Sequence, residues 1–277
     1  MYDLLISSKI LLVGAALLAA SIQDVKTREV SDKIWGAAMP IGAALTVLEV
    51  LSKPGYPYML ALLSASFSVA LAFGIYYARL YGGADAKALA AIAVTMPLPP
   101  YGYLNASPFF PLTVLGNGIL LSLSLILVCL AWNTWSYLRG AELFSGMSVK
   151  GWEKAVALLI GIRVRPSTAE SVHFNLMERA KEDGTKGFRF IHKLEDELEE
   201  EADLQREAKA PRRDEDDERE GSELEGISEE VKTPENYNYV WVTPSIPMIV
   251  FLLAGYILYF LAGDLVFRTV LALLQPF

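Results

Sequence analysis

Two aspartates, Asp24 and Asp85, each lie where a hydrophobic segment of the chain meets a short basic stretch. An ionisable side chain at membrane depth is energetically costly, so such a residue is a functional candidate by default. Two carboxylates at one level of a membrane can hydrolyse a peptide bond, because one acts as a base toward water while the other acts as an acid. Asp24 and Asp85 are therefore the candidate catalytic residues, and the sequence leaves open which of them is the base.

Each aspartate also has a purely structural interpretation. An acidic residue just past a transmembrane helix is ordinarily solvated, which would account for Asp24 alone. Asp85 follows Gly82, Gly83 and Ala84, and in such a turn it could cap the next helix by accepting a bond from an unpaired backbone N–H. The same small residues let the backbone turn tightly and let a helix or a substrate approach the carboxylate. The occurrence of both aspartates on one face favours the functional interpretation.

The elements that must position this pair are hydrophobic helices. The chain has 277 residues, of which 53% are hydrophobic, and the apolar residues are concentrated in long blocks. This pattern predicts an all-α polytopic membrane protein, because a spanning helix needs about 18 or more apolar residues. Five blocks approach or exceed that length, and the fourth has only about 13 residues. The six predicted spans are 4–22, 34–51, 58–78, 86–98, 112–135 and 246–265.

Loop charge sets the predicted orientation. With six spans, the basic residues gather on one face and only Lys53 and Arg268 remain on the other. If the fourth block did not span, the basic stretch after the fifth block would lie outside. The asymmetry predicts a cytoplasmic basic face and an external N-terminus. Two crossings separate Asp24 from Asp85, so both are expected on the cytoplasmic face. The residues of the basic face are Lys26, Arg28, Lys33, Arg79, Lys87, Arg139, Lys150, Lys154, Arg163 and Arg165.

The predicted domains are a membrane domain at 1–135, a cytoplasmic insertion at 136–242, and a last helix with the C-terminus at 243–277. Within the insertion, residues 195–230 hold 18 acidic and 5 basic side chains, so the rest of a chain of net charge −8 carries +5. Such an acidic, apolar-poor tract is typical of disorder or of a solvated helix. Residues 152–162 are apolar but too short to span easily, which predicts an interfacial or docked helix.

Other polar residues give no sign of a cofactor. His173 and His192 lie 19 residues apart without a nearby cysteine, and the single cysteine, Cys129, lies in an apolar block. We therefore expect no metal site and no intrachain disulfide. Asp264 and Glu49 fall toward the outer face, where we expect solvated helix ends or packing contacts. No basic patch indicates binding to nucleic acid.

The segments around both aspartates resemble motifs of the type IV prepilin peptidase family, and of its archaeal preflagellin peptidases in particular. Residues 24–30 through Trp35 resemble the first aspartate motif of these GxGD-type membrane proteases, and residues 82–87 resemble the second, GxGD followed by x-Lys. Ala84 stands where many members have the second glycine. Residues 150–174 resemble the archaeal cytoplasmic insertion, and residues 243–248 resemble the proline-containing entry to the last helix. The cysteine segment of many bacterial members is absent, which argues against their methyltransferase activity.

The resemblance implies a multi-pass cell-membrane aspartic endopeptidase without metal or cofactor, in which Asp24 and Asp85 are catalytic. Gly82, Gly83, Ala84 and Lys87 would support the second motif, with Lys87 most simply a headgroup-level anchor. The implied partners are the lipid bilayer and preflagellin or prepilin precursors, whose short basic leader is removed just before a hydrophobic helix at the cytoplasmic border. Three alternatives stay open. One is a presenilin-like intramembrane protease, although its Pro-Ala-Leu motif is absent, and another is a non-enzymatic scaffold that recruits partners through the acidic insertion. The third is a transporter, although charged residues in the middle of the spans are sparse.

Overall fold

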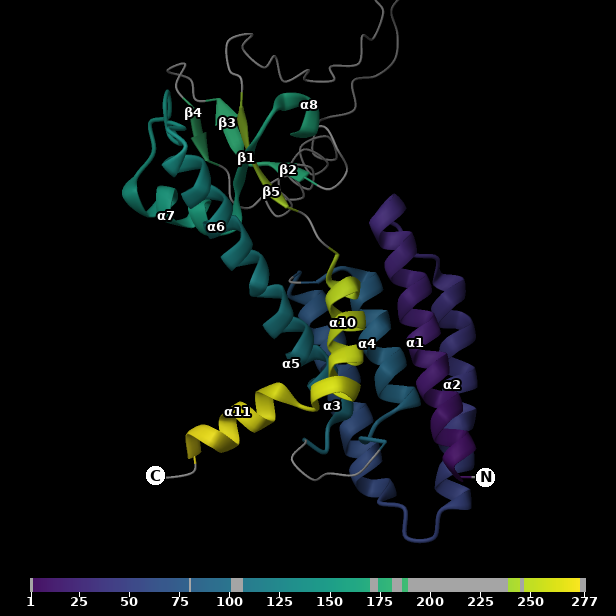
Figure 1. The fold of residues 1–277 in the computed structure, drawn as a ribbon. Helices are drawn as coiled ribbons and strands as arrows, with labels where there is room; N and C mark the ends of the chain where they lie inside the picture. The colour runs from purple at the N-terminus through teal and green to yellow at the C-terminus, as the bar shows by residue number, and fades with distance from the viewer. Residues whose placement is uncertain are drawn as a thin grey trace, which may run out of the picture. The chain divides into compact units, whose positions relative to one another are not determined.

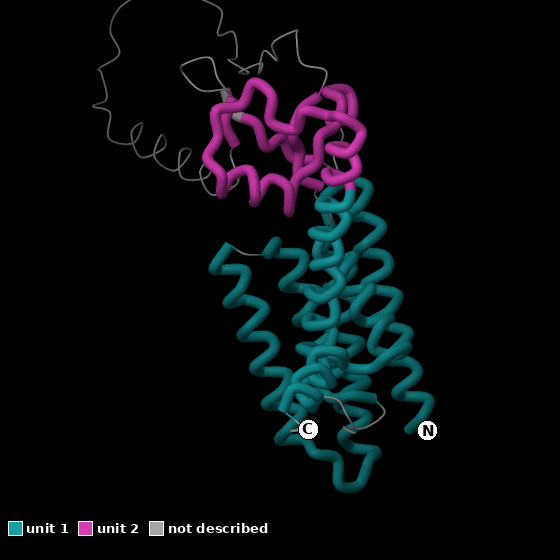
Figure 2. The backbone as a smooth tube through the Cα atoms, turned by 60° about the vertical axis from the view of Figure 1, so that its left-hand side comes forward, with its two compact units in different colours: residues 1–131, 245–277 teal, residues 132–244 magenta. Residues whose placement is uncertain are grey.

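The structure is a computed structural model that describes residues 2–79, 81–100, 107–169, 174–180, 186–188, 239–244 and 247–274. The chain forms two compact units, one of Met1–Ala131 with Ser245–Phe277 and one of Trp132–Pro244 (Figure 2). We call them the membrane unit and the insertion unit. The predicted acidic tract at 195–230 lies outside the described residues, as do His173 and His192.

The membrane unit is built from helices that run back and forth along one another (Figure 1). Helix α2 packs against α1 and α4, α3 packs against α4, and α10 packs against α5 and α1. Apolar side chains from most of these helices form one continuous core. The helices are α1 (Tyr2–Thr27), α2 (Asp32–Ser52), α3 (Tyr58–Tyr77), α4 (Gly83–Thr95), α5 (Phe110–Ser122), α6 (Ser124–Leu138), α10 (Met248–Ala262) and α11 (Leu265–Leu274).

The mostly helical membrane architecture expected from the apolar blocks is confirmed. Among the described residues, four helices are long and apolar enough to cross a membrane, namely α1, α2, α3 and the continuous helix Phe110–Leu138 that α5 and α6 form. Counting the bent pair α10 and α11 as one span raises the number to five. Helix α4 has 13 residues, or about 20 Å at 1.5 Å per residue, which is short of the ~30 Å hydrocarbon core. Six complete spans therefore stay a prediction.

Helix α4 ends inside the membrane unit, where hydroxyl groups of its neighbours contact carbonyls at its end and just beyond it. Each hydroxyl has one hydrogen and so donates to one carbonyl at a time. The Thr46 hydroxyl of α2 lies 3.0 Å from the Val94 carbonyl oxygen and 2.8 Å from that of Thr95. The Ser64 hydroxyl of α3 donates to the Pro97 carbonyl at 2.5 Å. Unsatisfied backbone groups are costly where water is absent, so these contacts let a short helix end at depth.

Two pairs of helices approach each other at glycines. A Cβ at Gly42 of α2 would lie 1.9 Å from Thr95 Oγ1 of α4. A Cβ at Gly255 of α10 would lie 2.5 Å from the Gly118 backbone nitrogen of α5 and 2.5 Å from the Val114 carbonyl oxygen. Small residues at such contacts allow the backbones of membrane helices to pack closely. These two contacts fix α4 against α2 and α10 against α5.

Glu49 is not a solvated helix end, as one sequence interpretation allowed. Its carboxylate accepts a 2.5 Å hydrogen bond from Lys9 Nζ, and the two side chains are 10% and 4% exposed. The pair joins α1 to α2, and both side chains are buried. A charge in this environment requires a partner, because burying an isolated ion is far more costly than burying a neutral group.

The last predicted span is broken at Gly263 and Asp264, where α10 and α11 bend by 59°. Gly263 has a φ of +80°, a left-handed conformation that glycine adopts without strain. Asp264 is 2% exposed, so its solvation, one of the two expectations, is wrong. Its carboxylate accepts bonds from the Thr113 hydroxyl at 2.7 Å, the Ser107 N–H at 3.1 Å and the Phe267 N–H at 2.9 Å. Asp264 thus satisfies the start of α11 and joins it to α5.

The insertion unit contains strands as well as helices, so the all-α prediction does not extend to it. Strands β1, β5 and β2 form an antiparallel sheet in that order, and β3 pairs with β4. Trp241 of β5 is 1% exposed, donates its indole N–H to the Leu143 carbonyl at 3.0 Å and stacks on Phe144. The elements are α7 (Gly151–Ile160), β1 (Ile162–Val164), α8 (Pro166–Ala169), β2 (Phe174–Leu176), β3 (Glu178–Ala180), β4 (Lys186–Phe188) and β5 (Val240–Pro244).

Candidate active site

Asp24 lies in the last turn of α1, where it is half-buried. The helix ends because Arg28 adopts a φ of 60°, and its N–H donates to the Asp24 carbonyl at 3.0 Å. This left-handed residue after the helix is a common way to satisfy the final carbonyls. The neighbouring Gln23 side chain accepts a 2.9 Å bond from the Ser31 N–H, and Ser31 caps α2. Asp24 therefore sits on a helix end that is fixed to the next helix.

Asp85 is the third residue of α4, and its carboxylate accepts a 3.2 Å bond from the Gly82 N–H. The capping role that we considered as its structural interpretation is therefore present. The first turn of a helix favours negative charge, because its unpaired N–H groups point toward that end. A Cβ at Gly82 would lie 3.3 Å from Asp85 Oδ2, so glycine at this position leaves room around the carboxylate.

Tyr81 contributes a phenol next to the second aspartate. Burial, followed by the negative charge of Asp85, raises the pKa of the Tyr81 hydroxyl above its ordinary value. Both causes disfavour the phenolate, so Tyr81 stays a neutral hydrogen-bond donor at physiological pH. Its side chain packs against the apolar core of the membrane unit. Sequence analysis missed Tyr81, and its position directly before the Gly-Gly-Ala-Asp turn was the available signal.

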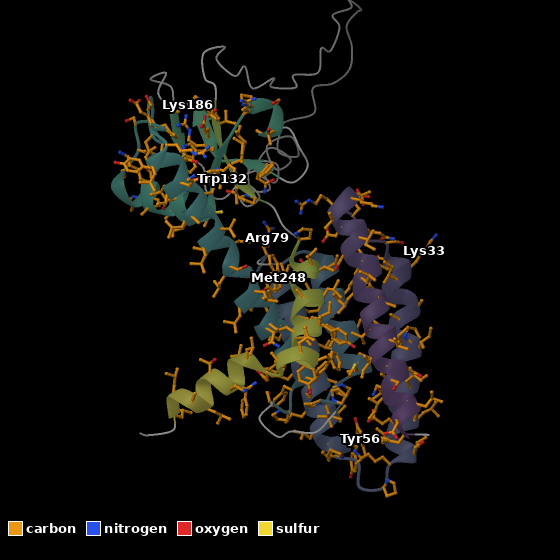
Figure 3. The ribbon with its side chains drawn as sticks, in the orientation of Figure 1. Lys33, Tyr56, Arg79, Trp132, Lys186 and Met248 are labelled. Atoms are coloured by element: carbon orange, nitrogen blue, oxygen red, sulfur yellow. The ribbon has the colours of Figure 1, made fainter. Side chains whose placement is uncertain are left out.

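Both aspartates lie at the same end of the membrane unit. Asp24 precedes the connection from α1 to α2, and Asp85 follows the connection from α3 to α4. Figure 3 shows Lys33, in the first turn of α2, and Arg79, in the connection from α3 to α4, at one end. Tyr56, from the connection between α2 and α3, lies at the other end. Helices α1, α2 and α4 pack against one another. The small residues of the second motif, 82–84, lie at this end as well.

Lys87 forms an ion pair that the sequence did not reveal. Its Nζ donates to Asp32 Oδ1 at 2.6 Å, and the side chains are 40% and 76% exposed. Asp32 is the first residue of α2, so the pair joins the beginnings of α2 and α4. Lys87 is thus more than a headgroup-level anchor. Sequence alone could not identify Asp32, because 55 residues separate the partners.

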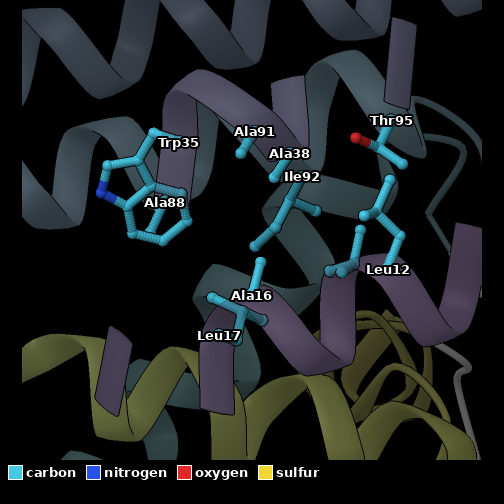
Figure 4. A pocket seen from close by; sticks show the side chains of 10 residues that line it. Leu12, Ala16, Leu17, Trp35, Ala38, Ala88, Ala91, Ile92 and Thr95 are labelled. Carbon is cyan, nitrogen blue, oxygen red and sulfur yellow. The ribbon is translucent and has the colours of Figure 1, made fainter. Parts of the chain in front are cut away.

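A small apolar cavity lies between the middle of α1, the first part of α2 and the later turns of α4 (Figure 4). Its volume of about 10 Å³ leaves room for about one water molecule. Trp35 of α2 is 3% exposed there, and its indole N–H has no hydrogen-bond acceptor within the described ranges. The lining residues are Leu12, Val13, Ala16, Leu17, Trp35, Ala38, Ala88, Ala91, Ile92 and Thr95.

Comparison with known proteins identifies the family. Residues 11–134, which include both candidate aspartates, match the type IV leader peptidase family, and residues 153–265 match the archaeal peptidase A24 C-terminus, type II. Together the two matches span most of the chain. The chain belongs to the type IV leader peptidase family. It is also similar to the preflagellin peptidase of Methanococcus voltae, with 23% identity over 265 residues that cover 92% of this chain and 95% of that protein.

Membership of the type IV leader peptidase family makes the chain a membrane peptidase and confirms the resemblance that its motifs carry. The structure separates two groups of polar residues. Asp24, Asp85 and Lys87 gather at one end of the membrane unit, whereas Asp264 is enclosed at the break between α10 and α11. In the part of the chain that the structure describes, no group of three or more His, Cys, Asp or Glu side chains could hold a metal ion.

Proposed function

We propose that this leader peptidase is an aspartic endopeptidase that removes the short basic leader from preflagellin or prepilin precursors, with Asp24 and Asp85 as its catalytic pair. The observation that carries the proposal is the position of both carboxylates at one end of the membrane unit, each on a helix terminus. Similarity to a preflagellin peptidase over nearly the whole chain supports the substrate class. The other buried carboxylates described above, Glu49 and Asp264, are engaged in structural contacts.

In the proposed mechanism, one aspartate is ionised and takes a proton from water as that water attacks the scissile carbonyl. The other aspartate is protonated and donates its proton, so that the carbon–nitrogen bond breaks and the amine leaves with a hydrogen. Two neighbouring carboxylates cannot both ionise cheaply, so they would share one proton and titrate as a pair.

The proposed reaction takes place at the cytoplasmic border of the membrane. The basic residues at the catalytic end, including Lys26, Lys33 and Arg79, support a cytoplasmic orientation by the positive-inside rule. A precursor whose leader carries lysines or arginines is retained on the same side for the same reason. Its cleavage site, just before the hydrophobic helix, would then meet the two aspartates at the level where that helix enters the lipid.

The decisive experiment reconstitutes the full chain in liposomes with a preflagellin precursor and identifies the released leader by mass spectrometry. We expect Asp24→Asn and Asp85→Asn each to abolish cleavage while the protein still inserts into the membrane. Asp3→Asn is a matched control, because Asp3 is an exposed residue in the first turn of the same helix as Asp24. Near-normal turnover by either Asn variant would remove that residue from the catalytic role, and cleavage within the hydrophobic stretch would favour an intramembrane protease.

A further inference from the structure

Trp35 combines deep burial with a hydrogen-bond donor that has no acceptor among the residues that the structure describes. The side chain is 3% exposed, and its indole nitrogen is buried. Most buried donors in proteins are paired, and an unpaired one lowers stability. An indole N–H can donate but cannot accept. The group that satisfies it must therefore offer an acceptor atom, such as a carbonyl or carboxylate oxygen.

Trp35 lies at the level of the two candidate catalytic aspartates. It is the fourth residue of α2, Asp85 is the third residue of α4, and Asp24 is the fourth residue from the end of α1. At a rise of 1.5 Å per residue, each lies within about 5 Å of the end of its helix. The contacts described above join the end of α1 to the start of α2, and the start of α2 to the start of α4. The three side chains therefore belong to one layer of the membrane unit.

The helix faces that meet Trp35 also carry both aspartates. Leu17 of α1 and Ala88 of α4 line the small apolar cavity together with Trp35. Asp24 lies seven residues after Leu17, and Asp85 lies three residues before Ala88. Residues at these spacings lie on the same side of a helix. Each aspartate thus continues a helix face that reaches the indole.

The indole nitrogen points toward the end of the membrane unit that holds the aspartates (Figure 4). Along α4, the labelled residues run from Thr95 to Ala88, which is the direction of Asp85, and the nitrogen lies on the side of the ring away from Thr95. The cavity extends from the ring toward Thr95, and its lining is apolar apart from Thr95 and Trp35. A water molecule there would lack the several polar partners that buried water needs. The acceptor for the indole is therefore to be sought at the catalytic end.

We propose that Trp35 is a substrate-binding residue whose indole N–H donates a hydrogen bond to a backbone carbonyl oxygen of the precursor at the cleavage site. This inference rests on the proposed function and names a further residue of the same site. A peptide must be extended to be cleaved there, and its carbonyls then lack the partners that a helix supplies. An apolar surrounding makes both the unpaired carbonyl and the unpaired N–H costly, so each satisfies the other. The bond would hold the scissile peptide between Asp24 and Asp85.

The first test removes the N–H of Trp35 and keeps the shape of the side chain. Benzothienylalanine, in which sulfur replaces the indole N–H, is introduced at position 35 by nonsense suppression. Trp241 is the matched control, because it is 1% exposed and its indole N–H donates to the Leu143 carbonyl at 3.0 Å.

The two positions should respond in opposite ways. At position 35, kcat/KM for precursor cleavage in liposomes should fall by roughly 10- to 100-fold. Thermal stability should not fall, since no hydrogen bond between described residues is lost there. At position 241, thermal stability should fall, because the Leu143 carbonyl loses its donor. Turnover per folded molecule should stay near normal in that control.

A second measurement observes the hydrogen bond without turnover. The chain has five tryptophans, so the protein labelled with nitrogen-15 at its indoles gives one N–H signal from each. Trp35→Phe identifies the signal of position 35 by its loss. In Asp85→Asn, the precursor should shift this signal downfield, as formation of a hydrogen bond does. An equal shift in Asp24→Asn without precursor would show that the acceptor is a carboxylate, and the proposal would be wrong.

These outcomes separate the role of Trp35 from the proposed function. Normal cleavage with benzothienylalanine at position 35, or an indole signal that the precursor does not move, overturns the role of Trp35 and leaves the catalytic pair intact. Loss of both activity and stability at position 35 would show that ring packing matters rather than the N–H, which also overturns the proposal. Cleavage by Asp24→Asn or Asp85→Asn overturns the catalytic pair, whatever the result at position 35.

Discussion

Gly42→Ala tests whether the close contact between α2 and α4 positions the active site. The added methyl would lie 1.9 Å from Thr95 Oγ1, 2.8 Å from Thr95 Cβ and 3.0 Å from Thr95 Cγ2. Rotation about χ1 moves Oγ1 and Cγ2 but leaves the Thr95 Cβ in place, so no rotamer of Thr95 removes the clash. Ordinary contact begins at 3.4 Å. To reach it, the helices must separate by about 0.6 Å for the contact with the Thr95 Cβ at 2.8 Å, and by about 1.5 Å for the contact with Oγ1 at 1.9 Å in the present rotamer.

The expected effects follow from this displacement. Overpacking of a fitted core costs about 1–3 kcal/mol of unfolding free energy. Eight of the 13 residues of α4 are buried, so it should move as a rigid rod and carry Asp85 with it. Misplacement of a catalytic group by about 1 Å can lower the rate by up to about 100-fold, so we expect a loss of about 10- to 100-fold in kcat/KM.

Gly36→Ala is the matched control, because Gly36 lies on the same helix and a Cβ there meets no atom within 4 Å. Both substitutions gain the same helix propensity of about 1 kcal/mol, so their difference isolates the clash. Precursor cleavage in liposomes and thermal unfolding in detergent measure the two effects. Gly42→Ala with Thr95→Ala should recover part of the loss, since only the contact at 2.8 Å remains. If Gly42→Ala matches Gly36→Ala in both assays, the α2–α4 contact does not set the position of Asp85.

Two further predictions concern buried polar groups away from the catalytic end. Lys9→Met alone should lower the unfolding free energy by about 3–5 kcal/mol, because it leaves the Glu49 charge without its partner. The double substitution Lys9→Met with Glu49→Leu should cost far less, because it removes both charges. A double-mutant cycle by thermal unfolding that finds the two substitutions additive would contradict this pairing. Asp264→Asn should cost about 1–3 kcal/mol, because an amide cannot accept all three bonds that the carboxylate accepts, and Thr113→Val, which removes one donor, should cost less. Turnover per folded molecule should stay near normal in Asp264→Asn, so a loss of catalysis without a loss of stability would refute this structural role.

Sequence reasoning identified the parts of the fold that depend on composition and on the order of the apolar blocks. Helices α1, α2 and α3 and the long helix of α5 and α6 follow from uninterrupted apolar runs, since lipid forces such runs to be helical. The position of Asp24 and Asp85 at the same end of the membrane unit follows because successive helices run in opposite directions. Neither inference requires knowledge of a specific side-chain contact.

What the sequence did not show depends on contacts between distant residues. The pairing of Lys87 with Asp32 and of Lys9 with Glu49 joins residues that are 55 and 40 positions apart. The break after α10 also escaped notice, because the apolar run continues past it and only Gly263 and Asp264 interrupt the pattern. The strands of the insertion unit have three to five residues each, too few for an alternating pattern to stand out.

Helix α4 begins at the end of the membrane unit that carries both aspartates, and because it is short it ends within the apolar core of that unit. Its first turn is closed by the bond between the Asp85 carboxylate and the Gly82 N–H. The Thr46 hydroxyl contacts the carbonyl of its last residue, Thr95, and the Ser64 hydroxyl donates to the Pro97 carbonyl just beyond the helix. A spanning helix whose hydrophobic length does not match the bilayer accommodates by tilting or kinking. Helix α4 cannot shift along its axis without breaking the hydroxyl contacts at its buried end. Those contacts therefore help to fix the position of Asp85 within the membrane unit.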